Sequence, residues 1–180
     1  MTVASAHGGP LALWYFGSDD PVLRVQFAKM IVEATGLHTP EVDAGATPTF
    51  KDVPLTLGGQ GDPLPFDYVE EAAAADIVGG FGDGRFAPWE PIKRIQLVRM
   101  ILRGAAAVGK PLPAYTGSEA VFSDAPPGSD LYTYVMTAYQ AGILDRSLGT
   151  DGERYFTPRS LATPGQVAKV TSNLLQLLER

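Results

Sequence analysis

Residues 75–100 read ADIVGGFGDGRFAPWEPIKRIQLVRM. A Gly-rich loop leads to a phenylalanine, and further along a glutamine opens an apolar run. Both residue types recur at one constant interval along the chain: Phe16, Phe86 and Phe156; Gln26, Gln96 and Gln166. We call the spacing between Phe16 and Phe86 the repeat interval. Two residue types on one interval indicate a structural unit that is used three times.

Each glutamine opens a run with helical periodicity: QFAKMIVEATGL, QLVRMILRGAAAVG and QVAKVTSNLLQLLE. Apolar residues spaced by three and four predict one buried face on each helix. Thr163, Pro164 and Gln166 fit a capping box, with Thr163 as N-cap and Pro164 at the first helical position. A shift by the repeat interval places the other caps at Lys93 and Leu23, and Arg94 and Arg24 at the first helical positions. Gly36 and Gly109 are the expected helix ends.

A second type of helix is expected over 66–78 and 131–143. Each follows a short leader, Phe50-Lys51-Asp52-Val53-Pro54 or Phe122-Ser123-Asp124-Ala125-Pro126. The Asp of each leader is expected to cap a turn or to bond nearby backbone amides. The sequence therefore predicts an all-α fold of three pseudo-equivalent helix-loop-helix repeats with long loops, forming a compact bundle.

The predicted repeats span residues 1–45, 46–115 and 116–180. The first is incomplete, because too few residues precede Leu11 for a leader and a first helix. Two explanations stay open: the helix lies upstream in a longer parent chain, or the N-terminal unit packs differently. We expect a chain cut from a longer one, with an exposed flank that could support self-association.

Composition narrows the possible functions. Hydrophobic residues make up 45% and charged residues 19% of 180, which is typical of a globular protein. The net charge is -6 without a basic run, which argues against nucleic-acid binding. Cysteine is absent, so no thiolate chemistry or disulfide is possible. No apolar stretch approaches the roughly 20 residues of a membrane span, and MTVASAHGGP lacks the pattern of a signal peptide.

Several motifs of residues 50–100 together resemble the S-layer homology (SLH) repeat, and the closest stretch is residues 75–100. In order, they are a leader of the form F-x-D-V, a helix, Asp76-Ile77-Val78-Gly79-Gly80 and the loop FGDGRFAP. The last motif is Ile92-Lys93-Arg94-Ile95-Gln96, at the place where the family has I-T-R-A-E. The first unit has Val22-Leu23-Arg24-Val25-Gln26 at the same place. The third departs, because Ala162-Thr163-Pro164-Gly165-Gln166 has Pro164 in place of the Arg. The resemblance covers residues 16–180.

The resemblance implies a pseudo-threefold helical module that anchors exported proteins to the bacterial cell wall or S-layer without a covalent bond. Its expected partner is a secondary cell-wall polysaccharide with an acidic pyruvyl ketal, or a peptidoglycan-linked glycan, bound in grooves between repeats. The expected location is extracellular. No cofactor and no catalytic activity are implied.

The residues themselves support part of this interpretation. An Arg in the first turn faces the positive end of the helix dipole, which costs about 0.3–1 kcal/mol unless an anion compensates. Arg24 and Arg94 are therefore candidate ligands for an acidic sugar substituent. The alternative is an ion pair with a local carboxylate, such as Asp19 or Asp83. In the third unit, Arg146 and Arg159 are possible substitutes.

The full set of candidate glycan-binding residues is Arg24, Arg94, Lys93, Gly79, Gly80, Asp83, Trp89, Tyr68 and Gly142. For most of them a structural role stays open. The loop glycines fit tight turns, and they could also let a sugar approach the backbone. Trp89 could stack on a sugar or pack between helices. Tyr68 and its counterpart Tyr134 are expected in the core or at a groove edge, and the repeated Phe in the core.

Catalysis finds little support in the sequence. His7 and His38 have no nucleophile or metal partner nearby in sequence. The carboxylates at Asp62, Asp67, Glu70 and Glu71 fit a solvated helix start. No hydrolase, zincin or EF-hand motif occurs. The rival to glycan binding is a protein–protein assembly module built from degenerate repeats.

Overall fold

The computed structural model describes residues 20–37, 47–57, 65–145 and 153–179. This part of the chain contains helices and no strand, so the predicted all-α class is confirmed. The helices are α1 (Arg24–Thr35), α2 (Pro65–Ala74), α3 (Arg94–Ala107), α4 (Tyr132–Gln140) and α5 (Pro164–Leu178). They begin close to the predicted positions, and Gly36 ends α1 in the left-handed conformation at φ 68°. Gly109, at φ 75°, follows α3 in the same conformation.

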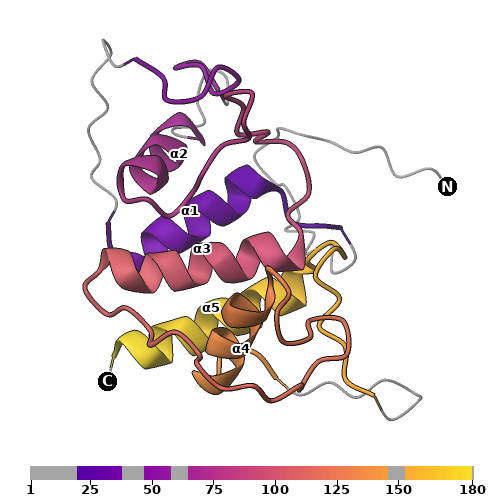
Figure 1. The fold of residues 1–180 in the computed structure, drawn as a ribbon. Helices are drawn as coiled ribbons and strands as arrows, with labels where there is room; N and C mark the ends of the chain where they lie inside the picture. The colour runs from indigo at the N-terminus through magenta and orange to yellow at the C-terminus, as the bar shows by residue number, and fades with distance from the viewer. Residues whose placement is uncertain (1–19, 38–46, 58–64, 146–152, 180) are drawn as a thin grey trace, which may run out of the picture.

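The three helices that open at the repeated glutamines form the centre of the molecule. α1, α3 and α5 pack against one another and run in the same direction (Figure 1). Each buries an apolar stripe, and Ile31, Ile101 and Leu174 are fully buried within it. The central helices therefore supply much of the core.

A closed ring of backbone hydrogen bonds joins the chain just before these helices. Val22 N donates to Ala162 O at 3.2 Å, Ala162 N donates to Ile92 O at 2.9 Å, and Ile92 N donates to Val22 O at 2.8 Å. The three residues are separated by the repeat interval. The ring holds the starts of α1, α3 and α5 together.

The recurrent glutamine has a local structural role. Its side-chain oxygen accepts the amide hydrogen of the N-cap residue in all three helices. The bonds are Leu23 N to Gln26 Oε1 at 2.8 Å, Lys93 N to Gln96 Oε1 at 2.9 Å and Thr163 N to Gln166 Oε1 at 3.2 Å. The predicted box at Thr163 is confirmed, since its hydroxyl accepts Gln166 N at 3.4 Å. Each glutamine thus satisfies a donor that the helix start would leave without a partner.

The shorter helices interlock the predicted repeats. α2 packs on α1 and α4 packs on α3, whereas within the described ranges α2 does not pack on α3 and α4 does not pack on α5 (Figure 1). Each first helix therefore covers the central helix of the preceding unit. The boundaries at residues 46 and 116 mark periods in the sequence and stay a prediction.

The outer face of α5 differs from the covered faces of α1 and α3. Val25, Ala28 and Val32 on α1 are buried. The residues two repeat intervals later are Gly165, Ala168 and Ser172. All three of these residues are exposed. The face of α5 thus carries small or polar residues where α1 is apolar.

Candidate functional site

The Asp of each leader fixes the loop that precedes α3 or α5. Asp52 accepts Phe86 N at 2.7 Å and Ala87 N at 2.8 Å through its two carboxylate oxygens. Asp124 accepts Phe156 N at 2.8 Å and Thr157 N at 2.7 Å in the same way. The prediction of bonded amides is confirmed, but the amides lie far from each Asp in sequence and not beside it. Each carboxylate therefore holds a long loop onto the core.

The clamped loops contain a strained residue at matched positions. Ala87 and Thr157 have φ of 58° and 54°, in the left-handed region that residues with a Cβ avoid. Phe86 and Phe156, which precede them, are almost completely buried, so their predicted core role is confirmed. Phe16 lies outside the described residues. The carboxylate bonds and the buried ring together hold this conformation in place.

Each clamped loop contacts the start of the central helix before it in sequence. Arg24 N donates to Glu90 O at 2.9 Å, and Val25 N donates to Pro88 O at 3.0 Å. At the next helix, Arg94 N donates to Ser160 O at 2.9 Å and Ile95 N donates to Pro158 O at 3.1 Å. We call the start of α1 with loop 81–91 the α1 junction, and the start of α3 with loop 153–161 the α3 junction. Pro164 has no amide hydrogen, so α5 cannot repeat the first bond.

The two arginines predicted as ligands occupy equivalent places in these junctions. Arg24 Nε donates to Phe86 O at 2.8 Å, and its guanidinium lies over the Phe86 ring at 4.6 Å. Arg94 Nε donates to Phe156 O at 2.7 Å, with its guanidinium over the Phe156 ring at 5.0 Å. The terminal guanidinium nitrogens of both arginines bond no acceptor among the described residues. Each junction therefore holds a positioned cation with donors that no described residue uses.

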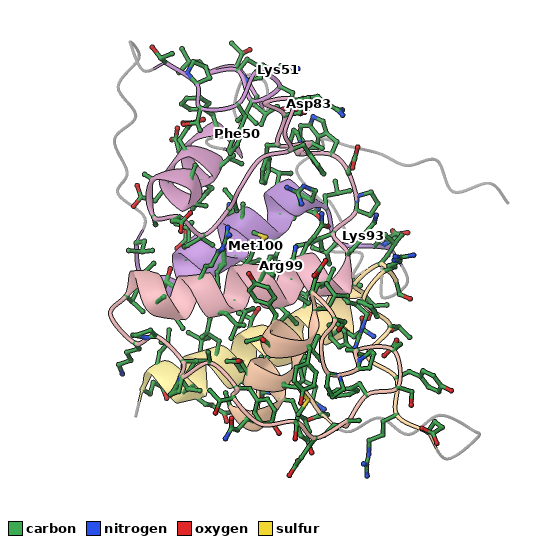
Figure 2. All side chains as sticks on the ribbon, viewed as in Figure 1. Phe50, Lys51, Asp83, Lys93, Arg99 and Met100 are labelled. Carbon is green, nitrogen blue, oxygen red and sulfur yellow. The ribbon has the colours of Figure 1, made fainter. Side chains whose placement is uncertain are left out.

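Asp83 does not pair with either arginine. It forms an ion pair with Arg85 at 2.7 Å, and Arg85 lowers its pKa through hydrogen bonds. Asp83 lies beside Lys51 and Phe50, well apart from Lys93 at the start of α3 (Figure 2). Asp19, the other carboxylate considered as a partner, lies outside the described residues. The alternative of an Arg24–Asp83 or Arg94–Asp83 pair is thus wrong.

The electrostatic surroundings of the two arginines differ. Burial lowers the pKa of Arg24, and the carboxylates of Glu90 and Asp52 act in the opposite direction. Burial also lowers the pKa of Arg94, and there the opposing carboxylate is Asp124. Arg24 is 5% exposed, while Arg94 is more accessible. Arg94 is therefore the less compensated and more reachable cation.

Side chains at equivalent positions increase this difference. The pairs related by the repeat interval, α1 junction first, are Leu23 and Lys93, Trp89 and Arg159, Glu90 and Ser160. At these three positions the α3 junction has Lys93, Arg159 and Ser160, whereas the α1 junction has an apolar, an aromatic and an acidic residue. Sequence reasoning missed Glu90 and also Phe81, which lies 5.2 Å from the Arg24 guanidinium. Alignment of the units, which pairs Glu90 with Ser160, could have revealed the first.

Gly79 and Gly80 differ in how closely they approach neighbouring residues. A Cβ on Gly80 would lie 2.6 Å from Phe50 Cε1 and 2.9 Å from Arg85 O. Gly80 is therefore required by close packing of the loop on the leader. A Cβ on Gly79 would meet Arg103 Nη1 at 3.7 Å, an ordinary contact. Gly79 places the backbone beside α3.

The remaining predicted residues lie at separate places. Trp89 is 56% exposed, which excludes the packing role between helices. Tyr68 is buried on α2 and donates a short hydrogen bond to Glu33 Oε1 on α1. Its counterpart Tyr134 is 37% exposed. Gly142 follows α4 at φ 75°, and its carbonyl accepts Asn173 Nδ2 at 3.2 Å.

Some of the residues considered from the sequence lie outside the described part of the chain. Arg159 is exposed in the α3 junction, and Arg146, His7 and His38 lie outside the described residues. Within the described ranges, no group of three or more His, Asp or Glu side chains is arranged to hold a metal ion. In the same ranges, no helix has the length and apolar character needed to span a membrane.

Two bacterial proteins are similar to this chain in sequence. An endoglucanase of Bacillus sp. (strain KSM-635) is 33% identical over 164 residues, which cover 89% of this chain and 15% of that protein. A surface layer protein of Brevibacillus choshinensis is 34% identical over 88 residues, which cover 49% of this chain and 7% of that protein. The chain thus spans a small fraction of the length of either relative. Residues 61–98, which include α2 and the start of α3, match the S-layer homology domain, so the resemblance to that family is confirmed for this segment.

Proposed function

We propose that this chain is a non-covalent anchoring module for the bacterial cell wall that binds an acidic glycan at its junctions. The observation that carries the proposal is Arg94, which is held by Phe156 O while its terminal nitrogens bond no described acceptor. A guanidinium presents paired donors that match the two oxygens of a carboxylate. A pyruvyl ketal, or another acidic sugar substituent, supplies such a group.

The guanidinium, more than the helix dipole, would hold the anion. The first two amides of α3 already donate to Ser160 O and Pro158 O, so they are not available to a ligand. The aromatic contact and the Nε bond fix the guanidinium in one orientation before the ligand arrives. Such preorganisation reduces the entropy that binding would otherwise cost.

The α3 junction is proposed as the main site. Lys93 and Arg159 add positive charge near Arg94, and both are exposed. At the α1 junction, Glu90 would repel an acidic ligand, and Arg24 is almost fully buried. Trp89 at that junction fits an apolar sugar face better than a charged substituent. We therefore expect unequal contributions from the two junctions.

The similarity of residues 61–98 to the S-layer homology domain, and of the chain to a surface layer protein, supports anchoring over catalysis. On this proposal the protein that contains this chain acts outside the cell, attached to the wall or S-layer, and the chain has no enzymatic role. The three-repeat organisation belongs to the same proposal. The ring formed by Val22, Ile92 and Ala162 supports it.

The test is co-sedimentation of the protein with purified bacterial sacculi, before and after acid extraction of the secondary polymer. We expect binding to intact sacculi and its loss after extraction. Binding that survives extraction would refute the secondary-polymer proposal and indicate peptidoglycan.

Substitutions separate the two junctions. Arg94→Met keeps an aliphatic chain over Phe156 and is expected to weaken binding at least about tenfold, because a charge-assisted contact is lost. Arg24→Met is expected to have a smaller effect. Lys29→Ala, an exposed lysine on α1 outside both junctions, is the charge-matched control. Circular dichroism melting of each variant separates loss of binding from loss of fold.

One observation favours assembly as a second candidate function. The loops of the junctions expose large apolar side chains: Phe81 at 41%, Trp89 at 56%, Tyr155 at 39% and Leu161 at 43%. Exposed apolar groups can mark contacts between proteins. If assembly is the function, sedimentation velocity will show oligomers of the wild-type chain, and Trp89→Ala will dissociate them. In that case the wild-type chain will not bind sacculi.

A further inference from the structure

A pocket of about 490 Å³ lies between the segment that precedes the second leader and the C-terminal end of α4. It is lined by Tyr115, Glu119, Met136, Tyr139, Gln140, Leu144 and Asp145. None of these residues belongs to the α1 or α3 junction. The pocket is therefore a separate site, and its size is that of a small-ligand site.

The outer wall of the pocket is held in place by polar contacts to α4. Tyr115 N donates to Thr137 Oγ1 at 2.9 Å. Tyr132 Oη donates to Glu119 O at 2.9 Å and to Gly117 O at 3.2 Å. The Tyr115 side chain lies against Gly117, where an added Cβ would be 2.3 Å from Tyr115 Oη. These contacts fix the position of the segment that carries Tyr115 and Glu119.

Among the described residues that line the pocket, the two charged side chains are both carboxylates. Glu119 is exposed, and its carboxylate makes no hydrogen bond or ion pair with the described residues. Asp145 forms an ion pair with Lys169 of α5, which neutralises one of the two carboxylates. The pocket also adjoins the C-terminal end of α4, where the helix dipole is negative. These contributions favour a cation.

Two aromatic residues and an apolar floor complete the site. Tyr115 and Tyr139 line it, and each is held by an edge-on contact to a neighbouring ring, Tyr132 at 5.8 Å and Phe122 at 5.5 Å. Tyrosine rings beside carboxylates attract ammonium groups through cation–π and charge interactions. Met136 and Leu144 supply the buried apolar surface.

We propose that this pocket binds an amino sugar through its protonated amino group. Glu119 accepts the ammonium, the tyrosine rings surround it, and the Gln140 amide offers a hydrogen-bonding group for sugar hydroxyls. The volume exceeds what a bare ammonium ion needs and accommodates a sugar ring. The site has the opposite charge preference to Arg94, and the proposal does not depend on the proposed function.

The experiment is an NMR titration of the ¹⁵N-labelled chain with glucosamine, N-acetylglucosamine and glucose. Glucosamine is expected to give saturable shifts of the amides in 115–119 and 139–145. The two uncharged sugars are expected to bind at least about tenfold more weakly, since they lack the charge-assisted contact. Equal binding of glucosamine and N-acetylglucosamine would refute the proposal, and so would glucosamine shifts confined to other residues.

A matched pair of variants tests the carboxylate. Glu119→Gln keeps the side-chain shape and is expected to weaken glucosamine binding about tenfold. Asp130→Asn removes a carboxylate near the opposite end of α4 and should leave binding unchanged. Unchanged binding in Glu119→Gln would overturn the proposal. Arg94→Met should retain glucosamine binding whatever its effect on sacculi, so failure of one proposal is distinguishable from failure of the other.

Discussion

Val22 N donates to Ala162 O at 3.2 Å, which joins two residues that lie two repeat intervals apart and links the first helix of the described chain to the last. Most repeat arrays are open, because each unit contacts only its neighbours. Here the third central helix contacts both the first and the second. The stability of each helix therefore depends on the other two.

This closure predicts the effect of truncation. Deletion of residues 162–180 removes α5, exposes the apolar stripes of α1 and α3, and leaves Val22 N without its acceptor. We expect loss of the cooperative thermal transition, measured by far-ultraviolet circular dichroism, since the remaining helices cannot bury their faces. A truncated chain with a sharp transition would show that the ring is not needed for folding.

The two backbone hydrogen bonds that Asp52 accepts predict a large loss of stability in Asp52→Ala. The substitution leaves the amides of Phe86 and Ala87 without an acceptor, at a cost of roughly 2–4 kcal/mol in the free energy of unfolding. Asp124→Ala should act similarly on the second loop. Urea unfolding measures the change, and Asp130→Ala, which removes a carboxylate outside both clamps, is the control expected to stay near wild type.

Gly80 and Gly82 form a matched pair within one loop. A Cβ at position 80 would approach Phe50 Cε1 to 2.6 Å, while a Cβ at position 82 would meet nothing within 4 Å. Gly80→Ala is expected to destabilise the protein by about 1–3 kcal/mol, because the loop or the Phe50 ring must move. Gly82→Ala should remain close to wild type in urea unfolding. Similar stabilities for both variants would contradict the close approach at Gly80.

Tyr68 predicts a loss of stability at high pH. Its hydrogen bond to Glu33, together with burial, raises the pKa of its phenol from 10.0 to about 12. The folded state thus holds the phenol proton more tightly than the unfolded chain does. The contribution of this group is complete below pH 10 and is lost as the pH rises toward 12.

Urea unfolding between about pH 8 and pH 11 measures this dependence. Tyr68→Phe should weaken the decline above the ordinary pKa of tyrosine, since the ionisable group is gone. Tyr134→Phe, at the matched but exposed position, should leave the decline as in wild type. Identical pH profiles of wild type and Tyr68→Phe would exclude Tyr68 as its source.

Local patterns in the sequence predicted the helices because helix starts and ends depend on nearby residues. Gln26, Gln96 and Gln166 bond an amide only three positions away, so a fixed spacing reveals them. The apolar periodicity predicted the buried faces for the same reason. Arg24 and Arg94 at the first helical positions follow from the same spacing.

Such local patterns could not predict contacts between segments that lie far apart in the sequence. The sequence could place Asp52 in a leader, but it could not show that Phe86 and Ala87 would supply the bonded amides. It also could not show that α2 packs on α1, or that Asp83 pairs with Arg85 instead of a junction arginine. Each of these polar side chains had several possible partners in the sequence, and only the folded structure shows which partner it bonds.

Local patterns in the sequence were enough to predict the helices and to place Arg24 and Arg94 at first helical positions, because these features depend on interactions within a few residues. The tertiary structure decided what surrounds each arginine. Arg24 is buried beside Glu90, whereas Arg94 is more accessible and lies near Lys93 and Arg159. Burial and charge at a junction depend on loops from another part of the chain, so two identical residues in the same local motif acquire different surroundings.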